Sequence, residues 1–264
     1  MTRLVHVSDL HFGAHDPGLA EALAACVLDL APSVIVAAGD LTQRGKRSEF
    51  AAAAAFFDRF VCPKIIAPGN HDTPLLNLAA RALSPFGRFA KRVAAGALPA
   101  YADDGALILA FNTARGLQWR LDWSLGVVDL EDLDRLIADF GAAAGSRARI
   151  AVCHHPLIDP PNAPFSARTL RGPEGAASLA AAEVDLVLTG HMHVRFAEAL
   201  PYGDRHTYAV GAGTAFSTRT REAPPGFNFI EVLDGELQVT AYEAHGSTYR
   251  QADRIHLPRR SARP

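Results

Sequence analysis

The chain has 264 residues, of which 49% are hydrophobic and 20% are charged. These fractions are ordinary for a globular protein, so they exclude a largely disordered chain and allow a sizeable core. The formal net charge of -2 excludes a general attraction to nucleic acid or to anionic membranes. We therefore expect no membrane partner, and nucleic acid is a partner that is not favoured.

The cysteines and the first residues indicate where the protein works. Cys26, Cys62 and Cys153 form no CxxC pair, and an odd number of cysteines favours free thiols in a reducing compartment. Residues 1–10 show neither the apolar core nor the cleavage site of a secretory leader. We therefore expect a cytoplasmic protein.

Short apolar runs of the kind found in strands that are buried on both faces recur through the first two thirds of the chain. They cover residues 3–8, 33–39, 64–68, 107–111, 149–153 and 185–189. Apolar residues at helical spacing lie between some of them, in 19–30, 50–61 and 130–140, and Asp129 would cap the last of these. This alternation predicts βα units with helices over the sheet.

The last third of the chain shows a hairpin signal in place of alternating strands and helices. Residues 227–233 and 236–242 flank Asp234-Gly235, a pair that favours a hairpin turn because both residues tolerate positive φ. We therefore predict a second, more antiparallel region that continues from residues 206–211. The segment 246–264 has several arginines and little apolar periodicity, so we expect an irregular tail or a small flap after a main domain of residues 1–245.

Polar side chains that can bind a metal directly follow the early strands. The set is Asp9, His11, Asp40, Asn70, His71, Asp72, His154, His155, His191 and His193. In α/β sheets ligands bind beyond the carboxyl ends of the strands, so loops far apart in sequence can form one site. Turn formation would explain Asp and Asn at such places, but it does not explain why the histidines gather there.

The chemistry of this set favours transition metals. Carboxylate, amide and imidazole groups together suit Zn, Fe, Mn or Co, and they do not match the all-oxygen preference of Ca²⁺ or Mg²⁺. One four-coordinate ion would leave about half of the groups without a role. We therefore predict two divalent or trivalent transition-metal ions that share one carboxylate, for which Asp40 is the natural bridge. Gly39, Gly69 and Gly190 precede candidate ligands, where the chain must turn sharply.

Five motifs, in this order, resemble those of the calcineurin-like metallophosphoesterase superfamily. They are Asp9-x-His11, Gly39-Asp40, Gly69-Asn70-His71-Asp72, His154-His155 and Gly190-His191-x-His193. The resemblance implies a four-layer αββα sandwich, the α/β fold of the metallo-dependent phosphatases. It implies one metal ion on Asp9, His11, Asp40 and His193. It implies a second ion on Asp40, Asn70, His154 and His191.

Within the superfamily the chain is most similar to the bacterial class III cyclic-nucleotide phosphodiesterases and glycerophosphodiesterases. The resemblance implies hydrolysis of a small phosphodiester by in-line attack of a metal-bridging hydroxide. Asn70 would bind metal through its amide oxygen and lie against the substrate. His71, as an imidazolium, would stabilise the phosphoryl group or protonate the leaving alkoxide. We expect Asp72 to accept a hydrogen bond from the other ring nitrogen of His71 and so to orient it.

Two departures separate the chain from other branches of the superfamily. Residues 39–45 resemble the GDxxDRG motif of protein Ser/Thr phosphatases, but Gln43 stands in place of the second Asp and Asp72 in place of a Glu. Lipid A precursor hydrolases typically carry Arg where His71 stands. Both comparisons disfavour those activities.

Several residues near the motifs allow more than one role. Arg168 and Arg171 would suit the recognition of a second phosphate or nucleotide group, as would Arg219 and Arg221, and solvated loop charge is the alternative. His155 is interpreted as packed against its strand or supporting a neighbouring ligand.

Trp119 and Trp123 are placed in the core or at its rim rather than stacked on a base. A DNA-repair-type nuclease and a phosphomonoesterase are the rival enzymes, but no net positive charge supports a nuclease. A non-enzymatic scaffold is disfavoured, because every expected ligand and His71 are present. A homodimer is kept open.

Overall fold

Two mixed β-sheets form the centre of the molecule. The computed structural model describes residues 1–142, 147–161, 163, 165–221 and 223–260. The first sheet has six strands in the order β12-β11-β10-β1-β2-β3. Their bounds are β1 (Thr2–Val7), β2 (Val34–Ala38), β3 (Lys64–Ala67), β10 (Gly226–Val232), β11 (Glu236–His245) and β12 (Thr248–Pro258). Strands β1 to β3 run parallel, and β10 to β12 continue the sheet in antiparallel pairs.

The second sheet also has six strands, in the order β4-β5-β6-β7-β9-β8. Their bounds are β4 (Ala100–Ala102), β5 (Ala106–Ala110), β6 (Ala148–Val152), β7 (Leu186–Thr189), β8 (Phe196–Ala199) and β9 (Tyr208–Gly211). The four inner strands β5, β6, β7 and β9 are parallel, and the edge strands β4 and β8 pair antiparallel.

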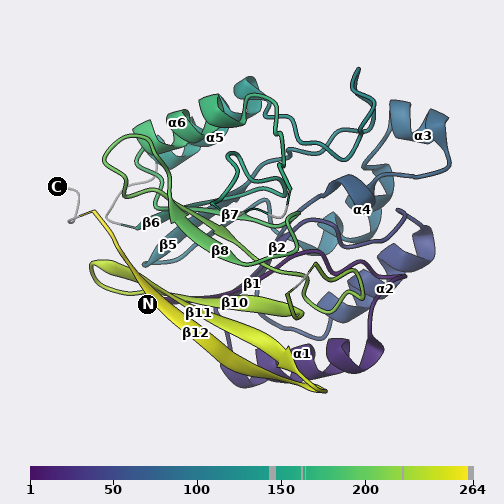
Figure 1. Cartoon of the computed structure of the whole chain (residues 1–264), viewed down its shortest axis with the longest axis horizontal. Helices are drawn as coiled ribbons and strands as arrows, with labels where there is room; N and C mark the ends of the chain where they lie inside the picture. Colours follow the sequence, from purple (N-terminus) through teal and green to yellow (C-terminus); the bar gives the residue numbers. More distant parts are fainter. Residues whose placement is uncertain (143–146, 162, 164, 222, 261–264) are drawn as a thin grey trace.

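Helices cover the outer face of each sheet (Figure 1). On the first sheet lie α1 (Pro17–Leu30) and α2 (Arg47–Phe57), and on the second lie α5 (Leu130–Ala142) and α6 (Gly172–Ala181). Four short helices occupy the connection that leads from the first sheet to the second. They are η1 (Asn70–Asp72), α3 (Leu78–Leu83), α4 (Gly87–Arg92) and η2 (Ala94–Gly96). The predicted four-layer αββα sandwich is therefore confirmed.

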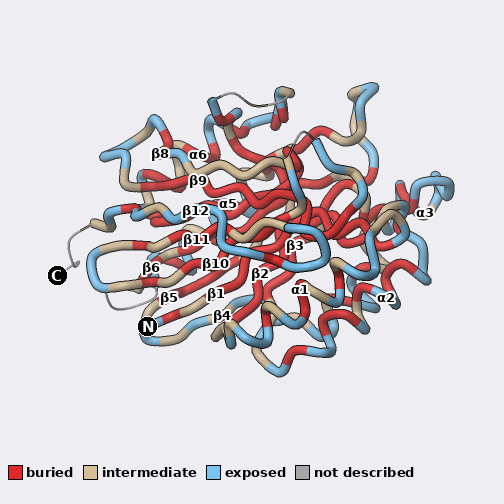
Figure 2. Tube along the Cα trace, turned by 60° about the horizontal axis from the view of Figure 1, so that its bottom comes forward, coloured by how far each residue is buried: buried red, intermediate tan, exposed pale blue. Residues whose placement is uncertain are grey.

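Alternate side chains of the central strands explain these layers. Val5 and Val7 of β1 pack with Leu23 of α1, whereas Leu4 of the same strand packs with Ile150 of β6 between the two sheets. A third apolar cluster lies between the second sheet and its helices. Figure 2 shows the strands as a buried centre surrounded by exposed loops. Since both faces of the central strands are covered, these strands read as nearly continuous apolar runs.

Three local predictions have different outcomes. Asp129 accepts from the backbone N–H groups of Glu131 and Asp132, so its capping role at α5 is confirmed. The β10–β11 hairpin is confirmed as well, with Gly235 at φ 78° in the turn. The helix predicted to reach residue 61 is too long, because α2 ends at Phe57.

The predictions for the C-terminal part were wrong in two respects. The segment 206–211 supplies β9 to the second sheet, whereas β10 and β11 extend the first, so these strands do not form a separate antiparallel region. The segment 246–264 is not an irregular tail over its described part, because Thr248–Pro258 pairs with β11 as the edge strand β12. Most of its side chains are exposed, so it shows no apolar run. Within the described residues, we find no helix long and apolar enough to cross a bilayer.

Tyr249 gives a test of how firmly β12 is docked. Its ring is buried with a centroid 5.5 Å from that of Phe227, and its hydroxyl donates to the Ala215 carbonyl. Tyr249→Ala should lower the free energy of unfolding by about 3 kcal/mol, because a large side chain is lost from a packed site. The exposed neighbour provides the control: Arg250→Ala should change it by less than about 0.5 kcal/mol in a urea titration. Equal stability of the two variants would mean that β12 is not part of the cooperative fold.

Candidate metal centre

Seven candidate ligands converge where the carboxyl ends of both sets of parallel strands meet. The first sheet contributes Asp9, His11, Asp40 and Asn70, and the loops after β6 and β7 of the second contribute His154, His191 and His193. All seven are buried. The sequence prediction had placed them in separate loops at strand ends, and the structure brings these loops together.

An unusual backbone conformation marks the site. Five of the seven candidate ligands have positive φ, between 48° and 68°. They are Asp9, His11, Asp40, His191 and His193. Residues other than glycine adopt this region rarely, and each such residue raises the energy of the fold by about 1 kcal/mol or more. Strain that is concentrated in one cluster of buried polar residues is a typical property of a functional site.

Glycines let the loops approach one another more closely than other residues would. A Cβ atom on Gly69 would lie 2.1 Å from Oδ1 of Asp40, and one on Gly39 would lie 2.6 Å from Nδ1 of His154. Gly39 also has φ of 86°, whereas Gly69 does not adopt a positive φ. The expected sharp turn is therefore present at Gly39, but Gly69 is needed for close approach.

The ligand atoms form two groups joined by Asp40. In the first, Nε2 of His193 lies 3.1 Å from Oδ1 of Asp9 and 3.4 Å from Nε2 of His11. In the second, Nε2 of His154 lies 3.3 Å from Oδ2 of Asp40. The same Oδ2 is 3.9 Å from Nε2 of His11, so one carboxylate lies against both groups. This position is the one that a bridging carboxylate would occupy.

Buried atoms without partners show that the residues fit a cation. Oδ1 of Asn70 and Nε2 of His191 are buried and make no hydrogen bond within the described part of the chain. Oδ1 of Asp9 and Nε2 of His154 also lack a hydrogen bond there, and their nearest polar neighbours are other candidate ligands, His193 at 3.1 Å and Asp40 at 3.3 Å. A buried polar atom without a partner costs about 1 to 3 kcal/mol. Since all four atoms belong to the candidate ligands, metal coordination would satisfy them together.

The opposite ring nitrogens are held by backbone carbonyls. Nδ1 of His154 lies 2.7 Å from the carbonyl of Ala38, and Nδ1 of His193 lies 2.7 Å from that of Arg219. An N–H donated on that side leaves the Nε2 atom of each ring to face the cluster. This arrangement fixes the tautomer and the orientation of a metal-binding histidine.

Burial and the two carboxylates act in opposite directions on the histidine pKa values. Burial lowers the pKa of His11 to about 4 and that of His191 to about 3. Burial also opposes the charge of His154, but Asp40 and then Asp9 outweigh it and raise the pKa of His154 to about 9. The pKa of His193 is raised in the same way, by Asp9 against burial.

Metal loading should therefore release protons. Below pH 9 a proton competes with a cation for Nε2 of His154, and the affinity for metal should fall as the pH falls. At pH 7 we expect release of roughly one to two protons per chain, from His154 and His193. Calorimetric titration of metal-free protein with Zn²⁺, in buffers of different ionisation enthalpy, measures this number. The same titration above pH 9 should give fewer protons, and an equal number at both pH values would contradict the assignment.

The expected contact between Asp72 and His71 was wrong. The Asp72 carboxylate accepts from the backbone N–H groups of Gly69, Leu41 and Thr42 and from the Thr42 hydroxyl. It therefore joins the loop after β2 to the loop after β3. Nδ1 of His71 instead lies 2.7 Å from the Gln43 carbonyl, to which it donates. The backbone of residue 43 thus performs the orienting role that was predicted for Asp72.

His71 also has a partner that the sequence analysis did not predict. Nη1 of Arg219 lies 2.9 Å from Nε2 of His71. A guanidinium has only donors, so Nε2 must accept, and Nδ1 must carry the ring proton. The ring is then a neutral imidazole in this arrangement, not the expected imidazolium.

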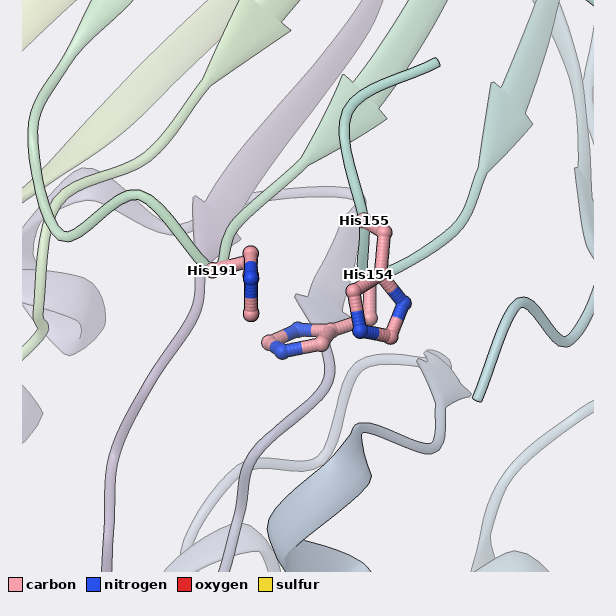
Figure 3. Close-up of side chains that lie close together, drawn as sticks. All are labelled: His154, His155 and His191. Carbon is pink, nitrogen blue, oxygen red and sulfur yellow. The ribbon is translucent and has the colours of Figure 1, made fainter. Parts of the chain in front are cut away.

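His155 lies close enough to His154 and His191 to form a possible metal-binding group with them, but both of its ring nitrogens have other hydrogen-bond partners. Figure 3 shows its ring together with those of His154 and His191, at the ends of β6 and β7. Nδ1 of His155 is 2.9 Å from the Thr113 hydroxyl, and Nε2 is 2.8 Å from the Ser124 carbonyl. Both nitrogens are therefore engaged by Thr113 and Ser124, which agrees with a packing role.

A pocket of about 580 Å³ opens over the centre. It is lined by Asp40, Asn70, His71, Asp122, Ser124, Leu125, Phe165, Ser166, Arg168, His191, His193, Arg219 and Arg221. Of the four arginines named as candidates for recognising a second phosphate or nucleotide group, Arg168, Arg219 and Arg221 belong to this lining. Arg171 does not belong to it; it is exposed at the start of α6. Phe165 and Asp122 belong to no motif, so no sequence pattern could have selected them.

A smaller pocket of about 260 Å³ adjoins the first. The two share Asn70, His71 and Ser124, and Trp123 and Leu75 line the smaller one. Trp123 thus lies at a rim, as expected. Trp119 is fully exposed, so the placement of that residue in the core or rim was wrong.

Comparison with known proteins agrees with this geometry. The family model described as calcineurin-like phosphoesterase matches residues 2–195. A Synechococcus sp. protein named "Probable cyclic nucleotide phosphodiesterase" is 27% identical over 206 residues, which are 76% of this chain and 72% of that protein.

Solved structures share the fold at low sequence identity. A purple acid phosphatase from yellow lupin superposes with a TM-score of 0.69 at 15% identity, over 98% of this chain and 54% of the phosphatase chain. The protein TT1561 of Thermus thermophilus superposes with a TM-score of 0.55 at 12% identity, over 96% of this chain and 98% of its own. The chain therefore spans about half of the lupin enzyme.

Proposed function

We propose that this chain, which belongs to the calcineurin-like phosphoesterase family, hydrolyses phosphodiester bonds with the help of two transition-metal ions. One observation carries the proposal: Oδ1 of Asn70 and Nε2 of His191 are buried without a hydrogen bond in the described chain, and the Asp40 carboxylate lies between the two ligand groups, 3.3 Å from His154 and 3.9 Å from His11. Such an arrangement is unfavourable in a protein that only serves as a scaffold, because the strain and the unpaired atoms would then bring no benefit.

The candidate ligands divide into two sets around the shared carboxylate. Asp9, His11, Asp40 and His193 would hold one ion, and Asp40, Asn70, His154 and His191 would hold the other. Mn, Fe, Zn and Co all suit these donors. When bound, such ions act as Lewis acids that activate water and offset the charge of a phosphoryl group.

The chain's own residues then position the substrate and move a proton. Nδ1 of His71 stays with the Gln43 carbonyl, so its Nε2 atom faces the pocket. A phosphoryl group that attracts the Arg219 guanidinium would free Nε2 of His71. A proton that Nε2 takes up from solvent water makes an imidazolium, which can pass this proton to the leaving oxygen and return to the neutral ring. Asn70 lines the same pocket, and its N–H₂ group can donate to a phosphoryl oxygen.

The name of the Synechococcus relative supports a diester as the substrate. We propose small diesters of the cyclic-nucleotide or glycerophosphodiester type, because the pocket of about 580 Å³ has the size of a small-molecule site. Phosphomonoesters and single-stranded DNA are the substrates of the rival functions.

A turnover panel with added Mn²⁺ tests the proposal. It comprises bis-p-nitrophenyl phosphate, p-nitrophenyl phosphate, 2′,3′- and 3′,5′-cyclic nucleotides, glycerophosphodiesters and single-stranded DNA. We expect diesters to be cleaved faster than the monoester, and we expect chelation to abolish turnover until metal is restored. Faster cleavage of the monoester would contradict the proposal, and a preference for DNA would favour a nuclease.

A further inference from the structure

Two pockets of different chemistry meet at His71. From this arrangement we propose that the site selects asymmetric phosphodiesters, in which one arm carries a second anionic group and the other a flat apolar group. The inference rests on the proposed phosphodiesterase function and specifies its substrate class. Asn70, His71 and Ser124 line both pockets, so a phosphoryl group held there has one pocket on each side.

The lining of the larger pocket includes three arginines and the carboxylates of Asp40 and Asp122. The arginines are Arg168, Arg219 and Arg221. In the described part of the chain, none of these three arginines forms an ion pair with Asp or Glu; the arginines that do so are others. The charge of the three therefore remains available to a bound anion. An arginine next to a phosphoryl-binding residue is suited to paired hydrogen bonds with a phosphate or carboxylate.

Two of these arginines are held in place by neutral groups. Arg219 donates to Nε2 of His71 over 2.9 Å, and the Arg221 guanidinium lies 4.4 Å from the ring centroid of Phe165. The Phe165 ring in turn lies 5.5 Å from that of His191. Arg219 and Arg221 are thus ordered beside the candidate metal centre by groups that carry no negative charge, which prepares both side chains for an anion.

One carboxylate limits where the second anionic group can lie. Asp122 lines the larger pocket, where it accepts from the backbone N–H and the hydroxyl of Ser124 at 3.0 and 2.6 Å. Ser124 borders both pockets, so Asp122 stands at their boundary. An anionic arm is therefore directed away from Asp122 and toward the arginines.

The smaller pocket suits an apolar arm. Leu75 and Trp123 supply apolar surface, and the Arg81 guanidinium lies 5.2 Å from the Trp123 ring centroid. Arg81 also lines this pocket; it is buried, its Nε donates to the Gly116 carbonyl, and its guanidinium faces the Trp123 ring. Arg44 also lines the pocket but is exposed to solvent. A flat group such as a nucleobase can stack on Trp123.

A pair of dinucleotides isolates the anionic arm. ApA and pApA contain the same diester, and only pApA carries a terminal phosphate. Wild-type protein loaded with Mn²⁺ should show kcat/KM about tenfold or more higher for pApA, the effect of a charge-assisted hydrogen bond. Arg221→Gln should reduce this preference to about twofold or less. Arg205→Gln, an exposed arginine outside both pockets, should keep the full preference.

The apolar arm needs a second comparison. In an analogue of pApA, a methyl group replaces the second nucleoside. Trp123→Leu should lower kcat/KM for pApA about tenfold, because stacking on the base is lost, and for the methyl analogue by less than about threefold. If Trp123→Leu does not fold, Leu75→Asp changes the same pocket at a half-exposed position. An equal loss on both substrates would overturn this half of the inference.

The inference and the proposed function fail differently. Equal turnover of ApA and pApA, with diester hydrolysis intact, would overturn the inference and leave the function in place. No turnover of any diester would contradict the function. Calorimetric binding to the metal-loaded protein then decides the inference: pApA should bind at least about tenfold tighter than ApA, and equal affinities would overturn it.

Discussion

Asp40→Asn is expected to lower the metal content from two ions per chain to at most one and to lower kcat by at least about 10² to 10³. Among the candidate ligands, Asp40 is the residue whose single oxygen lies near both groups, 3.3 Å from His154 and 3.9 Å from His11. Its other oxygen, Oδ1, accepts from the backbone N–H of His71 over 2.8 Å. An asparagine keeps the size and can keep this hydrogen bond, so the change removes mainly the charge.

Metal analysis and kinetics must be measured on the same preparation of this variant. Asp134→Asn, at an exposed position of α5, is the matched control and should retain both metal content and kcat. An Asp40→Asn protein that binds two ions and turns over at the wild-type rate would remove the shared carboxylate from the site. Thermal unfolding monitored alongside would detect a variant that has lost its fold.

His71→Ala is expected to lower kcat by about 10² to 10⁴ while the metal content stays near two ions per chain. Its Nε2 atom faces the pocket and its Nδ1 atom is held by Gln43, so the ring is positioned for proton transfer but is not among the ligands. The loss should be larger for substrates with an alkoxide leaving group than for p-nitrophenyl esters, because nitrophenolate leaves without protonation.

The leaving-group comparison separates proton transfer from positioning. If His71 only holds Arg219, then His71→Ala should slow nitrophenyl and alkyl diesters equally. His206→Ala, half-exposed between β8 and β9, is the control and should change neither rate. A wild-type rate on alkyl diesters in His71→Ala would exclude the ring from the chemistry.

The layers and the set of candidate ligands could be predicted because each leaves a local trace in the sequence. A strand covered on both faces must be apolar throughout, as in residues 34–38 and 186–189. Parallel strands bring their carboxyl ends to one edge, so the positions of Asp9, Asp40 and His154 after such strands are informative.

The parts that could not be predicted depend on contacts between distant loops. Asp72 follows His71 directly, which suggested a contact between their side chains, but its carboxylate lies among backbone donors of residues 41, 42 and 69. No local pattern reports that approach. The side chain of Arg219 reaches His71 from 148 positions further along the chain, again without a local signal.

The edge strand β12 was missed for a different reason. Tyr249 and Leu257 are the buried positions of its Thr248–Pro258 span, and the residues between them are exposed or half-exposed. An alternating pattern requires one covered face along the whole strand. Here the hydrogen bonds to β11 define the strand, and these are invisible in composition.

The candidate ligands come from both sheets, and this division has a consequence for the lifetime of the protein. Cations bound between Asp9 and His193, and between Asp40 and His154, would pin the two halves of the sandwich together. All three cysteines are free thiols, so no disulfide links the two halves. When transition metals are scarce in the growth medium, the folded chain would then be degraded faster by proteases. The metal supply would thus set the amount of this protein in the cell as well as its catalytic activity.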